Sequence, residues 1–71
     1  MHRYLILIEP TDTGYSAYSP DLSGCIATGR TTSEVEANMR DAIAFHLEGL
    51  RADGQPVPAL HTTAVYVEVA A

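Results

Sequence analysis

The chain has 71 residues, and its nine acidic residues against four arginines and no lysine give a formal net charge of −5. Such an acidic surface repels a phosphate backbone, so the composition argues against direct nucleic-acid binding by this chain. No stretch approaches the roughly 20 apolar residues of a membrane span, and the amino terminus does not read as a signal peptide, so we expect a cytoplasmic protein. A domain of this size buries only about 60% of its unfolded surface, so we also expect support from a partner or a second copy.

The first part of the chain predicts three strands. Residues 3–9 predict a strand whose middle, residues 4–8, has apolar side chains in both alternating sets, which is typical of a central strand covered on two faces. Turn-forming residues at 10–14 separate this first strand from a second strand at 15–19. A second turn at 19–24 leads to a short third strand at 25–29. Strands joined by such short turns are antiparallel.

The middle of the chain predicts one α-helix. Thr31 stands three residues before Glu34, which is the spacing of a capping box at a helix start. Gly54 permits a left-handed cap and Pro56 cannot continue the helix, so both predict its end. The residues at helical spacing on the apolar face are Val35, Met39, Ala42, Ile43, His46 and Leu50.

The end of the chain predicts a fourth strand. Val65, Val67 and Val69 alternate with Tyr66 and Glu68, the pattern of a half-buried strand. Because the helix crosses over before it, we expect this last strand to lie parallel to the first. The sequence thus predicts a single domain over residues 1–71, with an α+β, two-layer β-β-β-α-β fold. One helix covers only one face of the sheet, and a copy of the same protein is the simplest cover for the other.

Neither a nucleophile nor a metal site emerges from the sequence. Cys25 lacks a histidine at a spacing that would bring a base to it, so a packed, structural thiol is the favoured interpretation. His46 is best explained as a core or interface histidine. The strand and helix order resembles the first half of the RNase H fold, but a two-metal nuclease needs acids at strand centres. Glu9 lies past the end of the first strand and Glu68 points outward, so we expect no metal, no cofactor and no enzymatic activity.

The stretch from Tyr15 to Pro58 resembles the amino-terminal domain of HicB-type antitoxins. The pieces that carry the resemblance are the turn Y/F-x-PDL-x-GC, the helix entry T-G-x-T, the helix E-A-x-x-N-x-x-x-A-I and the exit L-E-x-x-x-x-x-G-x-P-x-P. Two positions depart from the family pattern. Ser23 replaces the second proline of the usual PDLPGC turn, and Val35 stands where alanine or an acidic residue is common.

The resemblance implies a partial RNase H-like domain that neutralises a HicA-type toxin. Such toxins resemble double-stranded-RNA-binding domains and cleave mRNA, and the antitoxin covers their active and RNA-binding surface. An acidic domain suits that role, because an RNA-binding surface is basic. Many HicB antitoxins carry a second, DNA-binding domain; we expect this chain to have none, and so not to bind an operator alone.

We expect a partner to contact the tyrosines before the turn, the turn Asp21–Gly24, which we expect to be exposed, and the acidic flank of the helix. The predicted contact residues are Tyr15, Tyr18, Pro20, Asp21, Leu22, Gly24, Asp41, Phe45 and Glu48. The residues expected to shape the turn and its exit are Pro20, Gly24, Cys25 and Gly29. Two alternatives stay open: a solitary homo-oligomeric relative with no toxin, and an enzyme, either a thiol hydrolase at Cys25 or a residual nuclease.

Overall fold

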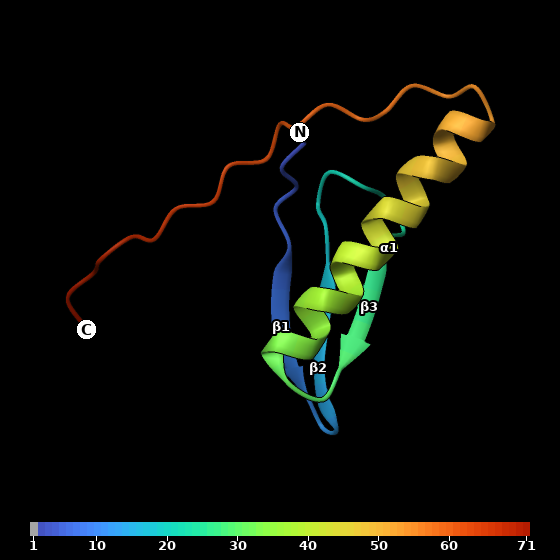
Figure 1. Cartoon of the computed structure of the whole chain (residues 1–71). Helices are drawn as coiled ribbons and strands as arrows, with labels where there is room; N and C mark the ends of the chain where they lie inside the picture. Colours follow the sequence, from blue (N-terminus) through green and yellow to red (C-terminus); the bar gives the residue numbers. More distant parts are fainter. Residues whose placement is uncertain (1) are drawn as a thin grey trace.

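Residues 2–71 are described by a computed structural model, in which a three-stranded sheet carries one helix on one face (Figure 1). The elements are β1 (Leu7–Thr11), β2 (Gly14–Tyr18), β3 (Ile26–Gly29) and α1 (Thr32–Ala52). Both strand pairs are antiparallel, and the strand order is β1-β2-β3. The predicted α+β class, with three antiparallel strands and one helix on one face, is confirmed.

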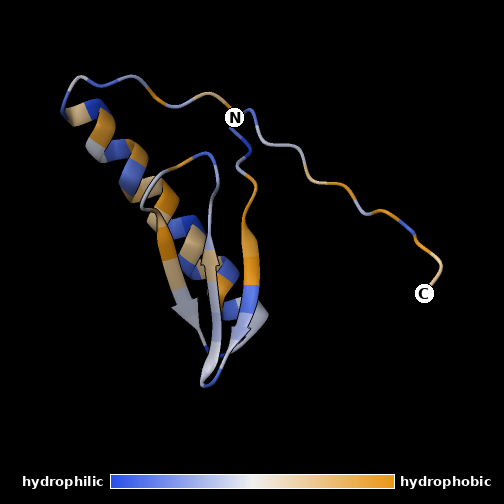
Figure 2. Cartoon of the chain, turned by 180° about the vertical axis from the view of Figure 1, so that it is seen from behind, coloured by the Kyte–Doolittle hydropathy of each residue, from blue (hydrophilic) through white to orange (hydrophobic). Residues whose placement is uncertain are grey.

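The register of the sheet divides its side chains between two unlike faces. Ala17 pairs with Ile8 on β1 and with Ala27 on β3, and all three belong to the core between the sheet and α1. Tyr18 pairs with Leu7 and Ile26, which therefore lie on the opposite face. That face carries no helix, as the view of the sheet from behind shows (Figure 2). We call it the open face.

The core lies between α1, the sheet and the turn that joins β2 to β3. Its most deeply buried large side chains are Leu22, Val35 and Met39. Leu47 is also buried in the same cluster, although the helical pattern places His46 rather than Leu47 on the apolar face. Val57, in the segment after the helix, packs against this cluster. The chain after α1 therefore contributes to the core, which the helical period alone does not predict.

Both predicted helix boundaries are confirmed by capping contacts. The Thr31 hydroxyl accepts a 3.0 Å hydrogen bond from the Glu34 amide, and the Glu34 carboxylate accepts one of 3.3 Å from the Arg30 amide. At the other end the Gly54 amide donates to the Arg51 carbonyl and the Gln55 amide to the Leu50 carbonyl. These two bonds form a Schellman motif, in which Gly54 takes the left-handed position with φ 71°.

The predicted fourth strand is absent among the described residues, so its parallel pairing with β1 is not formed. The residues after α1 cross residues 2–6, which we call the amino-terminal segment, and then run away from the sheet (Figure 1). The radius of gyration is 13.9 Å, against about 11 Å for a compact chain of this length. The alternation of valines with other residues concerns only the side chains. A strand also needs a partner for its backbone hydrogen bonds, and none of residues 2–71 lies beside this segment as a strand partner. No helix among residues 2–71 combines the length and apolar character that crossing a membrane requires.

Candidate functional site

The turn between β2 and β3 is built from two successive reverse turns. The Leu22 amide donates to the Ser19 carbonyl at 3.1 Å, which places Pro20 at the second position of the first turn, where its fixed φ is favourable. The Cys25 amide donates to the Leu22 carbonyl at 3.2 Å in the second turn. Gly24 is third in that turn and has φ 78°, a conformation that other residues adopt at a cost. Pro20 and Gly24 thus stand at the turn positions that suit their backbone preferences.

Gly29 is required for a different reason, which is the close approach of the backbone of α1. A Cβ atom on Gly29 would lie 2.6 Å from the Val35 amide nitrogen and 2.9 Å from its Cα. The first turn of α1 therefore rests directly on the end of β3. The glycine that leads from β3 into the helix sets the distance between the two layers of the fold.

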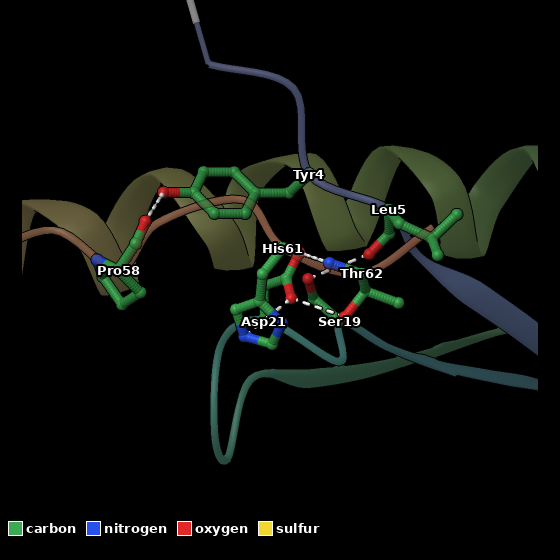
Figure 3. A network of polar contacts seen from close by, with 7 residues as sticks. All are labelled: Tyr4, Leu5, Ser19, Asp21, Pro58, His61 and Thr62. Carbon is green, nitrogen blue, oxygen red and sulfur yellow. Dashed lines mark hydrogen bonds and ion pairs between the residues drawn. The ribbon is translucent and has the colours of Figure 1, made fainter. Parts of the chain in front are cut away.

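Asp21 is the centre of a polar network that joins this turn to the segment after the helix (Figure 3). The Thr62 hydroxyl donates a 2.6 Å hydrogen bond to Asp21 Oδ1, and the Thr62 amide donates one of 3.5 Å to Oδ2. His61 Nε2 lies 3.1 Å from Oδ1 and forms an ion pair with it when the imidazole is protonated. The hydrogen bond from the Thr62 side chain is the main cause that lowers the pKa of Asp21 from its ordinary value.

Two further hydrogen bonds hold the amino-terminal segment in the same network (Figure 3). The Ser19 hydroxyl donates a 2.9 Å bond to the Leu5 carbonyl. The Tyr4 hydroxyl donates a 3.1 Å bond to the Pro58 carbonyl. The crossing segment, which we define as residues 58–62, is therefore fixed to the amino-terminal segment at one end and to the turn at the other.

The expectation that the turn Asp21–Gly24 is exposed is wrong for half of it. Asp21 and Leu22 are buried, with Leu22 only 1% exposed, whereas Ser23 and Gly24 are exposed. Asp21 is buried because its carboxylate is satisfied by the crossing segment, and Leu22 because it fills the core. The sequence contains the aspartate but no local signal for a partner 41 positions away.

Cys25 lies in the buried cluster, directly before β3, which agrees with the prediction that its thiol is packed and structural. Burial raises the pKa of its thiol, which disfavours the reactive thiolate form. Among residues 2–71, no three His, Cys, Asp or Glu side chains are grouped so that they could hold a metal ion.

The acidic flank of α1 is solvent-exposed and carries one large apolar side chain. Phe45 is 78% exposed, and Asp41 and Glu48 lie four residues before and three after it, on the same side of the helix. A shallow groove of about 420 Å³ runs from Phe45 to the edge of β3, where Ile26 is 69% exposed. We call the surface formed by Ile26, Asp41, Phe45 and Glu48 the β3-side surface. An exposed phenylalanine beside an exposed isoleucine is a surface that binding to a protein would bury.

The remaining predicted contact residues are divided between the core and the surface. Tyr15 is half-buried and packs against the core, and Pro20 is half-buried in the turn. Tyr18 is 41% exposed on the open face, in register with Ile26. The structure thus brings Tyr18 close to the β3-side surface through Ile26, but it places Tyr15 against the opposite face of the sheet.

The fold and the sequence have counterparts among known proteins. The model of a family described as HicB_like antitoxin of bacterial toxin-antitoxin system matches residues 4–70. The chain belongs to this family. The HicB-like resemblance carried by the turn and helix motifs is thereby confirmed, and with it the assignment to toxin–antitoxin systems.

Individual relatives of this HicB-like chain extend the comparison. It is 41% identical over 59 residues to a UPF0150 protein of Synechocystis sp., covering 82% of this chain and 75% of that protein. It is 38% identical over 64 residues to an uncharacterized 14.9 kDa protein of Haemophilus phage HP1, covering 90% of this chain but only 48% of the phage protein. A chain of a solved HicA3 and HicB3 toxin-antitoxin complex matches with a TM-score of 0.73 and 35% identity, covering 84% of this chain and 70% of that one.

Proposed function

We propose that this HicB-like chain binds a small HicA-type, mRNA-cleaving toxin and neutralises it by covering its active and RNA-binding surface. The observation that carries the proposal is the likeness, at 35% identity, to a chain of a solved toxin–antitoxin complex. In this proposal the chain acts by binding and not by catalysis. The buried Cys25, whose thiol has a raised pKa, gives no support to a thiol hydrolase.

The β3-side surface is the part of the molecule that best suits such a partner. An aromatic side chain that is exposed in the free protein and enters a partner's pocket typically contributes much of the binding energy. Phe45 fits that role, since it is 78% exposed. Asp41 and Glu48 place negative charge beside it, and a toxin surface that binds RNA is positively charged. The aromatic side chain would supply affinity, and the carboxylates would supply orientation and a faster association.

An inhibition assay with a HicA-type toxin encoded beside this chain tests the proposal directly. The purified chain should abolish cleavage of an RNA substrate at a one-to-one ratio of the two proteins. Phe45→Ala should weaken binding by about ten-fold or more, which is the effect of losing a central aromatic contact. Cleavage that continues undiminished in the presence of excess wild-type chain would contradict the proposed function.

Charge-reversal variants locate the docking surface. Asp41→Lys and Glu48→Lys should slow association with the toxin and flatten its dependence on salt. The matched control is Asp12→Lys, because Asp12 is also exposed but lies in the hairpin turn between β1 and β2. If all three variants bind like the wild type at low salt while inhibition persists, the toxin docks elsewhere on the chain.

A further inference from the structure

The segment after Thr62 has the side-chain pattern of a strand, but its residues are all exposed and it pairs with no strand among residues 2–71. Val65, Val67 and Val69 are 76%, 77% and 78% exposed, and Tyr66 is fully exposed. We call residues 63–71 the tail. Burying three alternate valines is favourable and leaving them in water is not, so such a segment is expected to pack against another surface.

A complementary site lies along β1 on the side away from β2. β1 is at the edge of the sheet, so its outer backbone groups have no strand partner among the described residues. A groove of about 320 Å³ lies next to the residues that lead into β1, between the amino-terminal segment and α1. Tyr4, Ile6, Met39 and Ile43 form its apolar lining, and its polar lining comes from His2, Glu36 and Arg40. A strand added at this edge would direct every second side chain into the groove.

The direction in which the tail leaves the domain is set by the polar network at its root. Thr62 is held by Asp21, and Pro58 is held by Tyr4. From this fixed point the tail runs outward, away from its own β1 (Figure 1). Its nine residues reach about 30 Å when extended, which is enough to run along the amino-terminal segment and β1 together.

We propose that the tail of one copy pairs with the β1 edge of a second copy and places its valines in that copy's groove, with the exchange made in both directions. A second copy is the occupant because each chain carries both parts of the contact, the unpaired tail and the unpaired β1 edge. These two parts do not meet within one described chain. A two-fold arrangement satisfies both halves at once. Only one of the nine tail residues is charged, Glu68, and it alternates with the valines and would stay out of the groove.

The mass of the full chain in solution tests the exchange. Light scattering across a dilution series should give an even-numbered oligomer of the 7.6 kDa chain for the wild type. Val67→Asp places a charge in the groove and should raise the dissociation constant by about ten-fold or more. Ala59→Asp adds the same charge at an exposed position before the root of the tail and should leave it unchanged. A monomeric wild type, or an oligomer that Val67→Asp does not weaken, would overturn the proposal.

Cross-linking separates exchange between copies from closure of the tail on its own chain. Glu9→Cys and Glu68→Cys each place one thiol on an exposed position, in a Cys25→Ala background, and a short bifunctional maleimide is added to a mixture of the two variants. Exchange predicts a product that contains one chain of each variant. A second experiment uses one chain that carries both Glu9→Cys and Glu68→Cys. If this chain is cross-linked only within itself and keeps the mass of a monomer, the tail folds back on its own β1, and the proposal is refuted.

This exchange is independent of the proposed docking of a toxin. The β1 edge and the β3-side surface lie at opposite edges of the sheet. A chain whose Val67→Asp variant still inhibits the toxin but has lost self-association supports both proposals. A chain that self-associates through the tail but leaves the toxin active supports the exchange alone.

Discussion

The Thr62 hydroxyl donates a 2.6 Å hydrogen bond to the Asp21 carboxylate, across 41 positions of the chain. This bond connects the turn between β2 and β3, which carries the family's motif, to the segment that follows α1. It explains why an aspartate in a tight turn is buried, and it fixes the point from which the tail leaves the domain. The charged residue of the motif therefore has an architectural role in this structure.

Removing the hydroxyl of Thr62 should loosen the crossing segment. Thr62→Ala deletes the donor of the shortest bond to Asp21 and leaves a buried carboxylate with fewer partners, so the melting temperature should fall. Thr63→Ala is the control, because its side chain is exposed at the adjacent position. Thermal unfolding followed by circular dichroism compares the two, and equal melting temperatures would show that the Thr62–Asp21 bond does not stabilise the fold.

The same network makes stability depend on pH. Folding lowers the pKa of Asp21 below its ordinary value of 3.8, chiefly through the Thr62 hydroxyl. The stabilisation is therefore complete well above 3.8 and is lost as the pH falls below it through the folded value. The difference in melting temperature between the wild type and Asp21→Asn should be largest near about pH 6 and should shrink toward about pH 3. A difference that stays constant over this range would contradict the assignment.

Two glycine-to-alanine changes should have opposite effects. Gly24 has φ 78°, so Gly24→Ala should cost about 1 kcal/mol of unfolding free energy even though nothing would clash with the new Cβ. Gly49 is exposed inside α1 with open space around it, so Gly49→Ala should add about 0.5–1 kcal/mol. Urea unfolding measures both. Two changes of the same sign would mean that backbone conformation does not control these positions.

Gly29→Ala tests the contact between β3 and α1. Its Cβ would lie 2.6 Å from a backbone nitrogen of the helix, and backbone gives way less readily than a flexible side chain. The helix must move off the sheet, and we expect a loss of about 1–3 kcal/mol in urea unfolding. Gly24→Ala serves as the comparison, because it strains the backbone without a clash. A neutral Gly29→Ala would indicate that the layers can separate without cost.

Local patterns were sufficient for the turn between β2 and β3, for those two strands and for the helix with its caps, but they misplaced the first strand. The apolar run predicts a central strand at residues 3–9, whereas β1 spans Leu7–Thr11, includes Glu9 and lies at an edge of the sheet, because no fourth strand pairs with its outer side among the described residues. Pro20 and Gly24 predict their turn because their own backbone preferences select it. Thr31 and Gly54 predict the helix ends because a cap is a contact within a few residues. The family resemblance depends on these same local motifs, so the sequence alone carries it, and the family model matches residues 4–70.

The tertiary structure decided which side chains those elements bury and what they meet. Asp21 was expected at the surface and is buried, because its partner Thr62 is remote in sequence. Leu47 is buried, although the helical period favours His46, and Val57 from the chain after α1 packs against the same core cluster. The valines of the tail predict a strand, but no strand partner for it lies among residues 2–71. Sequence determines local conformation and side-chain chemistry, whereas burial and pairing depend on which distant residues the fold brings together.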